Sequence, residues 1–159
     1  MSKETFTIKT EGFKELHDVL LEMANDIGYK KTARRVLVPA VKASMQPVLE
    51  MAKTIAPYDE KNTTTPHLRD TIKLYARVPT DRDMRSMYID KNDAVIGIVS
   101  TRTDKRGISQ EFGNESTSPQ PYLRPAIESQ AQKVVQILGT FLTYKLQQYK
   151  SKKIGRAHV

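Results

Sequence analysis

Apolar residues recur at two kinds of spacing along the chain, and these spacings predict its elements. Apolar positions three or four residues apart predict an amphipathic helix over residues 13–27. A second helical stripe covers residues 33–55, within which Pro39 and Pro47 predict either one kinked helix or two shorter helices. A third stripe starts at Ile127 and predicts a long helix that runs to about residue 149.

Alternation of apolar and polar residues predicts strands between the helical stripes. The candidate strands are residues 5–10, 68–78 (after one possible helical turn), 87–89, 94–100 and 108–112. Together the patterns predict an α+β fold. In it, a small antiparallel sheet of three to four strands packs against two to three helices, one of them the long C-terminal helix. Gly139 in that helix is interpreted as a point of close packing.

The length of 159 residues suits a single domain, which we assign to residues 1–149. The formal net charge is +8, and residues 150–159 contribute four of these excess positive charges and no acid. This segment is therefore predicted to be a basic, disordered tail. No stretch reaches the roughly 20 apolar residues that a membrane helix needs, and no signal peptide is recognised, so synthesis in the cytoplasm is expected.

Composition and motifs argue against catalysis and against bound cofactors. The absence of cysteine excludes disulfides, thiolate catalysis and cysteine-based zinc sites. No glycine-rich phosphate loop and no GxSxG nucleophile motif are present, and His17 and His67 have no evident catalytic partners. We therefore predict a protein that is not an enzyme and that binds no cofactor or metal.

The stretch from residue 108 to 126 is the most distinctive part of the chain. It predicts a strand that ends at Gly113, where a positive φ allows a sharp turn, followed by a polar loop. Pro121 and Pro125 stiffen the far side of this loop, and Pro125 suits the first turn of the following helix. The result is a stiff elbow that presents residues 122–124 at defined angles.

The charged and aromatic residues of this elbow allow two interpretations. Glu111 and Arg124 could close the loop through an intramolecular ion pair or hydrogen bond, or they could lie at a subunit interface. Phe112 and Tyr122 are candidate interface anchors, because aromatic residues dominate such sites. For Phe112, packing in the protein core is an equal alternative.

The same elbow carries a family resemblance. EFGN at 111–114 and PQPYLRPAIES at 119–129 resemble the EFGT…PQPFLRPA signature of the phage head–tail joining (neck or tail-completion) proteins. This is the tail-component family named after gene product ten of phage HK-ninety-seven. IAPY at 55–58 with HLRDTI at 67–72 is similar to the family's AP…TGxLRxSI. IKTEGFKELHDVL at 8–20 resembles its usual start.

The resemblance implies a structural virion protein of the neck. It would form a homo-oligomeric ring, a hexamer or dodecamer, that completes the tail end or joins the tail to the head connector. Its partners would be neighbouring head-connector and tail-tube or terminator proteins, with DNA passing through the lumen. A ring needs two different patches on each subunit. The residues expected at one of them are Glu111, Phe112, Gly113, Pro121, Tyr122, Leu123, Arg124 and Pro125.

Basic residues raise an alternative function, that of a small basic DNA-binding protein. Clustered cations suit the phosphate backbone of DNA, although a solvated surface is the simpler explanation for them. In a neck ring the same residues could face the DNA in the lumen. The candidate DNA-facing residues are Lys30, Lys31, Arg34, Arg35, Arg102, Lys105 and Arg106.

Overall fold

The computed structural model describes residues 13–63, 65–102 and 104–157, so the predicted strand at 5–10 lies outside the described residues. The helices are α1 (Phe13–Ile27), α2 (Tyr29–Thr32), a π-helical turn (Ala33–Leu37), α3 (Val38–Ile55), α4 (Leu68–Thr71), a 3-10 turn (Asp83–Arg85), α5 (Lys105–Phe112) and α6 (Leu123–Ala157). The strands are β1 (Lys73–Arg77) and β2 (Ile96–Ser100). The mixed helix and sheet content agrees with the predicted fold class.

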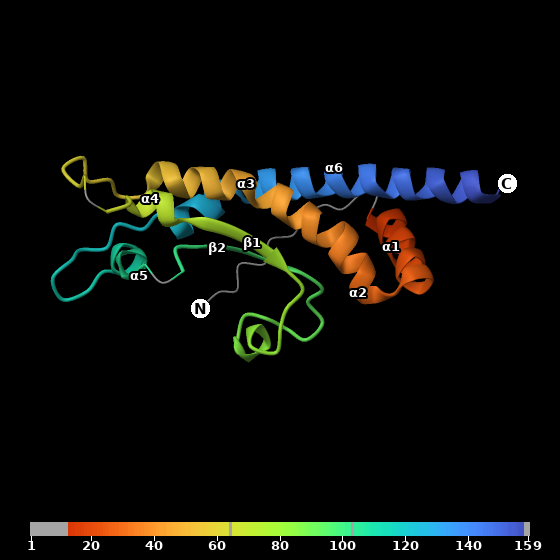
Figure 1. The fold of residues 1–159 in the computed structure, drawn as a ribbon, viewed down its shortest axis with the longest axis horizontal. Coiled ribbons are helices and arrows are strands. Elements are labelled where there is room, and N and C mark those ends of the chain that lie inside the picture. The colour runs from red at the N-terminus through yellow and green to blue at the C-terminus, as the bar shows by residue number, and fades with distance from the viewer. Residues whose placement is uncertain (1–12, 64, 103, 158–159) are drawn as a thin grey trace.

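Helix α3 is the centre of the molecule. It packs against α6 on one side and against the β1–β2 hairpin on the other, while α1 reaches the C-terminal half of α6 (Figure 1). The approach of the hairpin to α3 is closest at Gly97. A Cβ atom there would lie 2.8 Å from Cγ1 of Val41 and 3.1 Å from Cγ of Met45, so a side chain would push the strand off the helix.

The sheet is smaller than predicted. β1 and β2 pair antiparallel, with Tyr75 opposite Ile98, and the described residues form no further strand. Residues 87–89 lie in a turn in which Met87 is 87% exposed, so this expected strand is wrong. Three apolar residues between two charged turns cannot bury enough surface to hold a strand in place.

The expected strand at 108–112 is also wrong, because these residues belong to helix α5. Ile108 and Phe112 are four residues apart, which is a helical spacing. The side chain of Asp104 accepts a hydrogen bond from the backbone N–H of Arg106 and so caps the start of the helix. Gly113 ends it with a φ of 75°, the positive value that was predicted, but at a helix end rather than a strand end.

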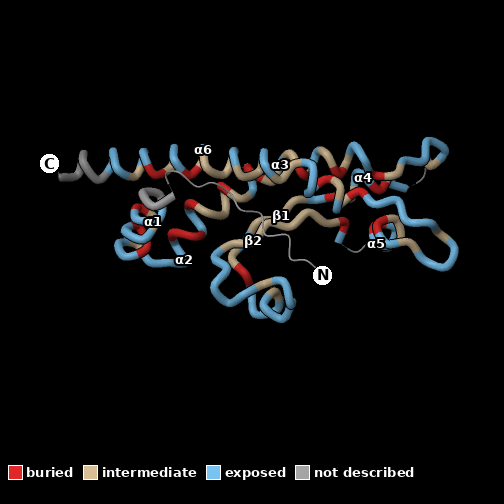
Figure 2. The backbone as a smooth tube through the Cα atoms, turned by 180° about the vertical axis from the view of Figure 1, so that it is seen from behind, coloured by how far each residue is buried: buried red, intermediate tan, exposed pale blue. Residues whose placement is uncertain are grey.

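Two apolar clusters form the core, and Figure 2 shows their buried stretches along α3 and α6. The elbow cluster joins α3, α4 and the start of α6, and its buried members are Val48, Ala52, Ala56, Leu68, Ile72, Tyr122 and Ala126. The helical cluster joins α1, the π-helical turn, α3 and the later part of α6. Its buried members are Val19, Met23, Val36, Ala40, Leu142 and Leu146.

The long helices differ in three respects from expectation. A π-helical turn precedes Pro39, whereas α3 continues past Pro47 without ending. α6 continues to Ala157, so residues 150–157 are helical rather than a disordered tail. A Cβ atom on Gly139 would meet nothing within 4 Å, so the close packing expected there is wrong.

Candidate functional site

The elbow between α5 and α6 is built around the carboxylate of Glu111. Its Oε2 atom accepts hydrogen bonds from the backbone N–H groups of Tyr122 (2.7 Å) and Leu123 (2.8 Å), and its Oε1 atom accepts one from Arg124 (3.0 Å). Glu111 is only 8% exposed. The first N–H groups of a helix have no partner within the helix, and a negative charge is favourable there. Glu111 therefore caps α6 from another helix.

Tyr122 also holds the elbow in place, through its burial and a hydrogen bond to α5. Its side chain is fully buried, and its hydroxyl donates a hydrogen bond of 3.1 Å to the carbonyl oxygen of Gly107 in α5. Burial raises the pKa of this tyrosine. A Cβ atom on Gly107 would lie 2.0 Å from Oγ1 of Thr101 and 3.0 Å from the hydroxyl of Tyr122. Only glycine fits at this crossing.

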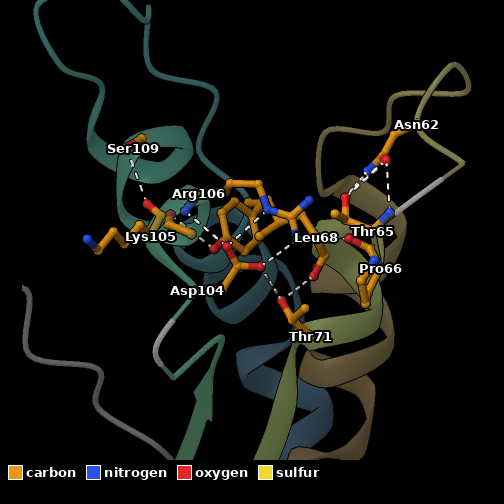
Figure 3. Close-up of polar contacts among 11 residues, drawn as sticks. Asn62, Thr65, Pro66, Leu68, Thr71, Asp104, Lys105, Arg106 and Ser109 are labelled. Carbon is orange, nitrogen blue, oxygen red and sulfur yellow. Dashed lines mark hydrogen bonds and ion pairs between the residues drawn. The ribbon is translucent and has the colours of Figure 1, made fainter.

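A second group of polar contacts, centred on Asp104, holds the N-terminal end of α5 (Figure 3). Asp104 accepts hydrogen bonds from the guanidinium of Arg106 (2.8 and 3.0 Å) and from the hydroxyl of Thr71 (3.0 Å). Arg106 also donates to the carbonyl oxygen of Pro66 at 2.8 Å. The hydrogen bonds from Arg106 hold the pKa of Asp104 below its ordinary value. α5 is thus tied to the α4 region as well as to α6.

The outer face of α5 is apolar and uncovered. Ile108 is 65% exposed and Phe112 is 76% exposed, whereas Gly107 and Glu111 on the same helix are buried. Since Ile108 and Phe112 are four residues apart, they lie on one face. The polar network therefore holds a helix whose apolar face is turned to solvent.

The predicted interface residues divide into two groups. Glu111 and Tyr122 are buried within the subunit, so they shape the elbow rather than contact a partner directly. The others are exposed or half-buried: Phe112, Gly113, Pro121, Leu123, Arg124 and Pro125. The alternative of core packing for Phe112 is wrong.

The intramolecular link between Glu111 and Arg124 is present, but through the backbone N–H of Arg124. The guanidinium of Arg124 instead pairs with Glu128 at 2.9 Å on the exposed side of α6. Asp104, Thr71, Gly107 and Ile108 were missed by the sequence analysis. A capping aspartate two residues before Arg106 was the available signal for α5.

The predicted DNA-facing residues do not form one patch. Lys30, Lys31, Arg34 and Arg35 are exposed on α2 and the π-helical turn. The other three lie near α5, at the opposite end of the long axis (Figure 1): Arg102, Lys105 and Arg106.

Two of the three basic residues near α5 are engaged within the subunit. The guanidinium of Arg102 lies over the ring of Tyr75 at 4.5 Å, and Arg106 is held by Asp104. The four exposed cations of α2 and the π-helical turn are therefore the better candidates for contact with DNA.

Other kinds of site were sought across the described part of the chain. Within it, no group of three or more histidine or acidic residues is placed to hold a metal ion. His67 stacks on Tyr58 with ring centroids 4.0 Å apart, and the guanidinium of Arg69 lies 3.7 Å from the centre of the same Tyr58 ring. No described helix is both long and apolar enough to cross a membrane.

Comparison with known proteins gave no relatives. A scan against protein-family models and searches of curated proteins and of solved structures returned no match.

Proposed function

We propose that the chain is a structural subunit of a phage neck. In this role it forms a homo-oligomeric ring that completes the tail end or joins the tail to the head connector, and it resides in the virion. The observation that carries the proposal is the exposed Ile108–Phe112 face, on a helix fixed by buried polar contacts. Rigid apolar anchors of this kind are what a subunit interface needs.

The residues that resemble the neck family are the ones that build this elbow. Glu111 caps α6, Gly113 takes the positive φ that ends α5, and Tyr122 fills the core beneath the elbow. The shared signature thus has a structural reason in this chain, namely the presentation of α5. Assembly rather than catalysis is the function that such an arrangement supports.

The decisive experiment is electron microscopy of lysates from a phage whose copy of this gene is inactivated. We expect filled heads beside unattached tails, and restoration of whole virions by the wild-type gene supplied in trans. A Phe112→Asp gene should fail to restore them, whereas Tyr144→Asp, at a site 57% exposed on α6, should succeed. Intact infectious virions without the gene would overturn the proposal.

A second candidate function, binding of duplex DNA, is favoured by one observation. Lys30, Lys31, Arg34 and Arg35 are all exposed within one short stretch. Binding through them would weaken steeply as salt is raised, because counterions are released from DNA. A fluorescence anisotropy titration at low and physiological salt tests this, with the four residues changed together to glutamine as the variant. Binding that is equal in both proteins would exclude the cluster.

A further inference from the structure

A groove lies between the N-terminal helices and the loop that connects the two strands. Its volume is about 530 Å³, within the range of about 300–1,000 Å³ typical of binding pockets. Its apolar lining comes from Leu20, Leu21, Ala24, Leu37, Val78 and Met84. Leu21, Tyr29 and Met84 line it and are 43%, 68% and 40% exposed, so large apolar side chains are left open to solvent.

The α5 face has a chemistry that matches the groove. It is a convex helix with Ile108 and Phe112 at its centre, flanked by the exposed charges Lys105 and Glu115. The lining of the groove is largely apolar and also includes charges of both signs: Lys30, Asp81, Lys91 and Asp93. An apolar centre with a charged rim is the usual anatomy of a protein interface, and here each surface can pair with the other.

The two surfaces are well separated along the elongated molecule: α5 lies near one end, and α1, α2 and the loop between the strands lie away from it, toward the other end and the middle (Figures 1 and 2). A rigid α5 therefore cannot fill the groove of its own subunit, but it can reach the groove of a second copy. Such a contact is heterologous, since each subunit uses two different patches. Heterologous contacts generate rings when the rotation between subunits closes.

We propose that α5 of one copy docks, through Ile108 and Phe112, into the groove between α1, α2 and the 78–94 loop of the next copy. This inference rests on the proposed ring, and it names the second patch that the ring needs. The occupant of the groove is a second copy of this chain.

Complementary variants test the docking by sedimentation velocity. Phe112→Asp disables the helix face and leaves the groove intact, whereas Leu21→Asp disables the groove and leaves the helix face intact. Both sites are exposed, so both variants should fold, which circular dichroism verifies. We expect the wild-type chain to form large oligomers and each variant alone to remain monomeric. An equal mixture should form dimers and nothing larger, because only one intact contact can form.

Cross-linking gives an independent readout in a chain without cysteines. Phe112→Cys and Leu21→Cys chains carrying different tags should form a mixed disulfide under mild oxidation. Tyr144→Cys paired with Leu21→Cys should not. Ile127→Asp, 48% exposed on α6, serves as the assembly control and should behave as the wild type.

The outcomes separate this inference from the proposed function. Oligomers that survive both aspartate variants, without the specific cross-link, would overturn the docking and leave the ring standing. A chain that stays monomeric at the highest attainable concentration and gives no cross-link would also overturn the docking. Failure of the proposed function would appear elsewhere, as intact virions in the lysate of the gene-inactivated phage.

Discussion

The elbow and the helical cluster hold their parts of the molecule together by different means. The helical cluster consists of apolar side chains from four helical segments, among them Val36, Leu142 and Leu146. The elbow adds a buried polar network to its apolar cluster, with Glu111 as the only buried charged residue among those described. The elbow is held by burial together with buried hydrogen bonds. The helical cluster is held mainly by burial, and an exposed hydrogen bond from the Tyr149 hydroxyl to the Asp26 carboxylate joins α6 to α1 beside it.

This difference affects how sharply each region is defined. Apolar packing tolerates changes that preserve volume and pattern. A buried carboxylate with three donors tolerates very little, because each donor left unpaired costs free energy. The elbow is therefore the region whose geometry is fixed, and it is also the region that presents the exposed apolar face of α5. The following predictions test this contrast, from the largest expected effect to the smallest.

Glu111→Ala should have the largest effect, a loss of roughly 3–4 kcal/mol in the free energy of unfolding, because it leaves three N–H groups of α6 without their charged acceptor. Urea unfolding measures this loss, and hydrogen exchange should show loss of protection at Tyr122, Leu123 and Arg124. Glu128→Ala removes an exposed glutamate and should cost less than about 0.5 kcal/mol. Equal losses in the two variants would contradict the capping role.

Leu142→Ala should cost about 3 kcal/mol, because it opens a cavity in the helical cluster. Its effect should be confined to that region, so the amide NMR shifts of residues 107–113 should stay unchanged. Leu142→Met conserves volume and should cost less than about 1.5 kcal/mol. Shift changes that spread into α5 would show that the two regions are not independent.

Gly107 in α5 and Gly139 in α6 should respond to alanine with opposite signs. Gly107→Ala should cost about 2 kcal/mol, because its Cβ would collide with the side chain of Thr101. Gly139→Ala meets open space and should raise stability by up to about 1 kcal/mol through better helix propensity. Thermal unfolding of both variants decides this. A tolerated Gly107→Ala would mean that α5 can move away from Thr101.

Acid should weaken the polar contacts of Asp104 that tie α5 to the α4 region. The pKa of Asp104 is lowered in the folded protein, so its contribution to stability is present above the ordinary carboxyl pKa of about 4. That contribution is lost as the pH falls through the lowered value. The stability difference between the wild type and Asp104→Asn should therefore shrink below about pH 4. A difference that persists unchanged at lower pH would rule out this linkage, and Asp81→Asn serves as the exposed control.

The sequence by itself predicted the elements that depend on repeated burial. The periodic apolar residues placed α1, the end of α3 before Ala56 and the course of α6, and the alternating runs placed β1 and β2. Gly113 took the positive φ that its lack of a side chain predicted. These features follow from local spacing, because a helix or strand face that meets the core must repeat with the period of the backbone.

Tertiary structure alone decided the rest. The cap at Asp104 was a local signal for the helix at 108–112, but the contacts of Gly107 and Glu111 with Tyr122, which fix that helix, appear in no local pattern. Tyr122 was buried and Phe112 was exposed, although both are aromatic residues of one elbow. Hydrogen bonds that join residues 11–15 positions apart depend on how α5 crosses α6. The sequence pattern shows which residues are apolar, but only the tertiary structure determines which of them are buried.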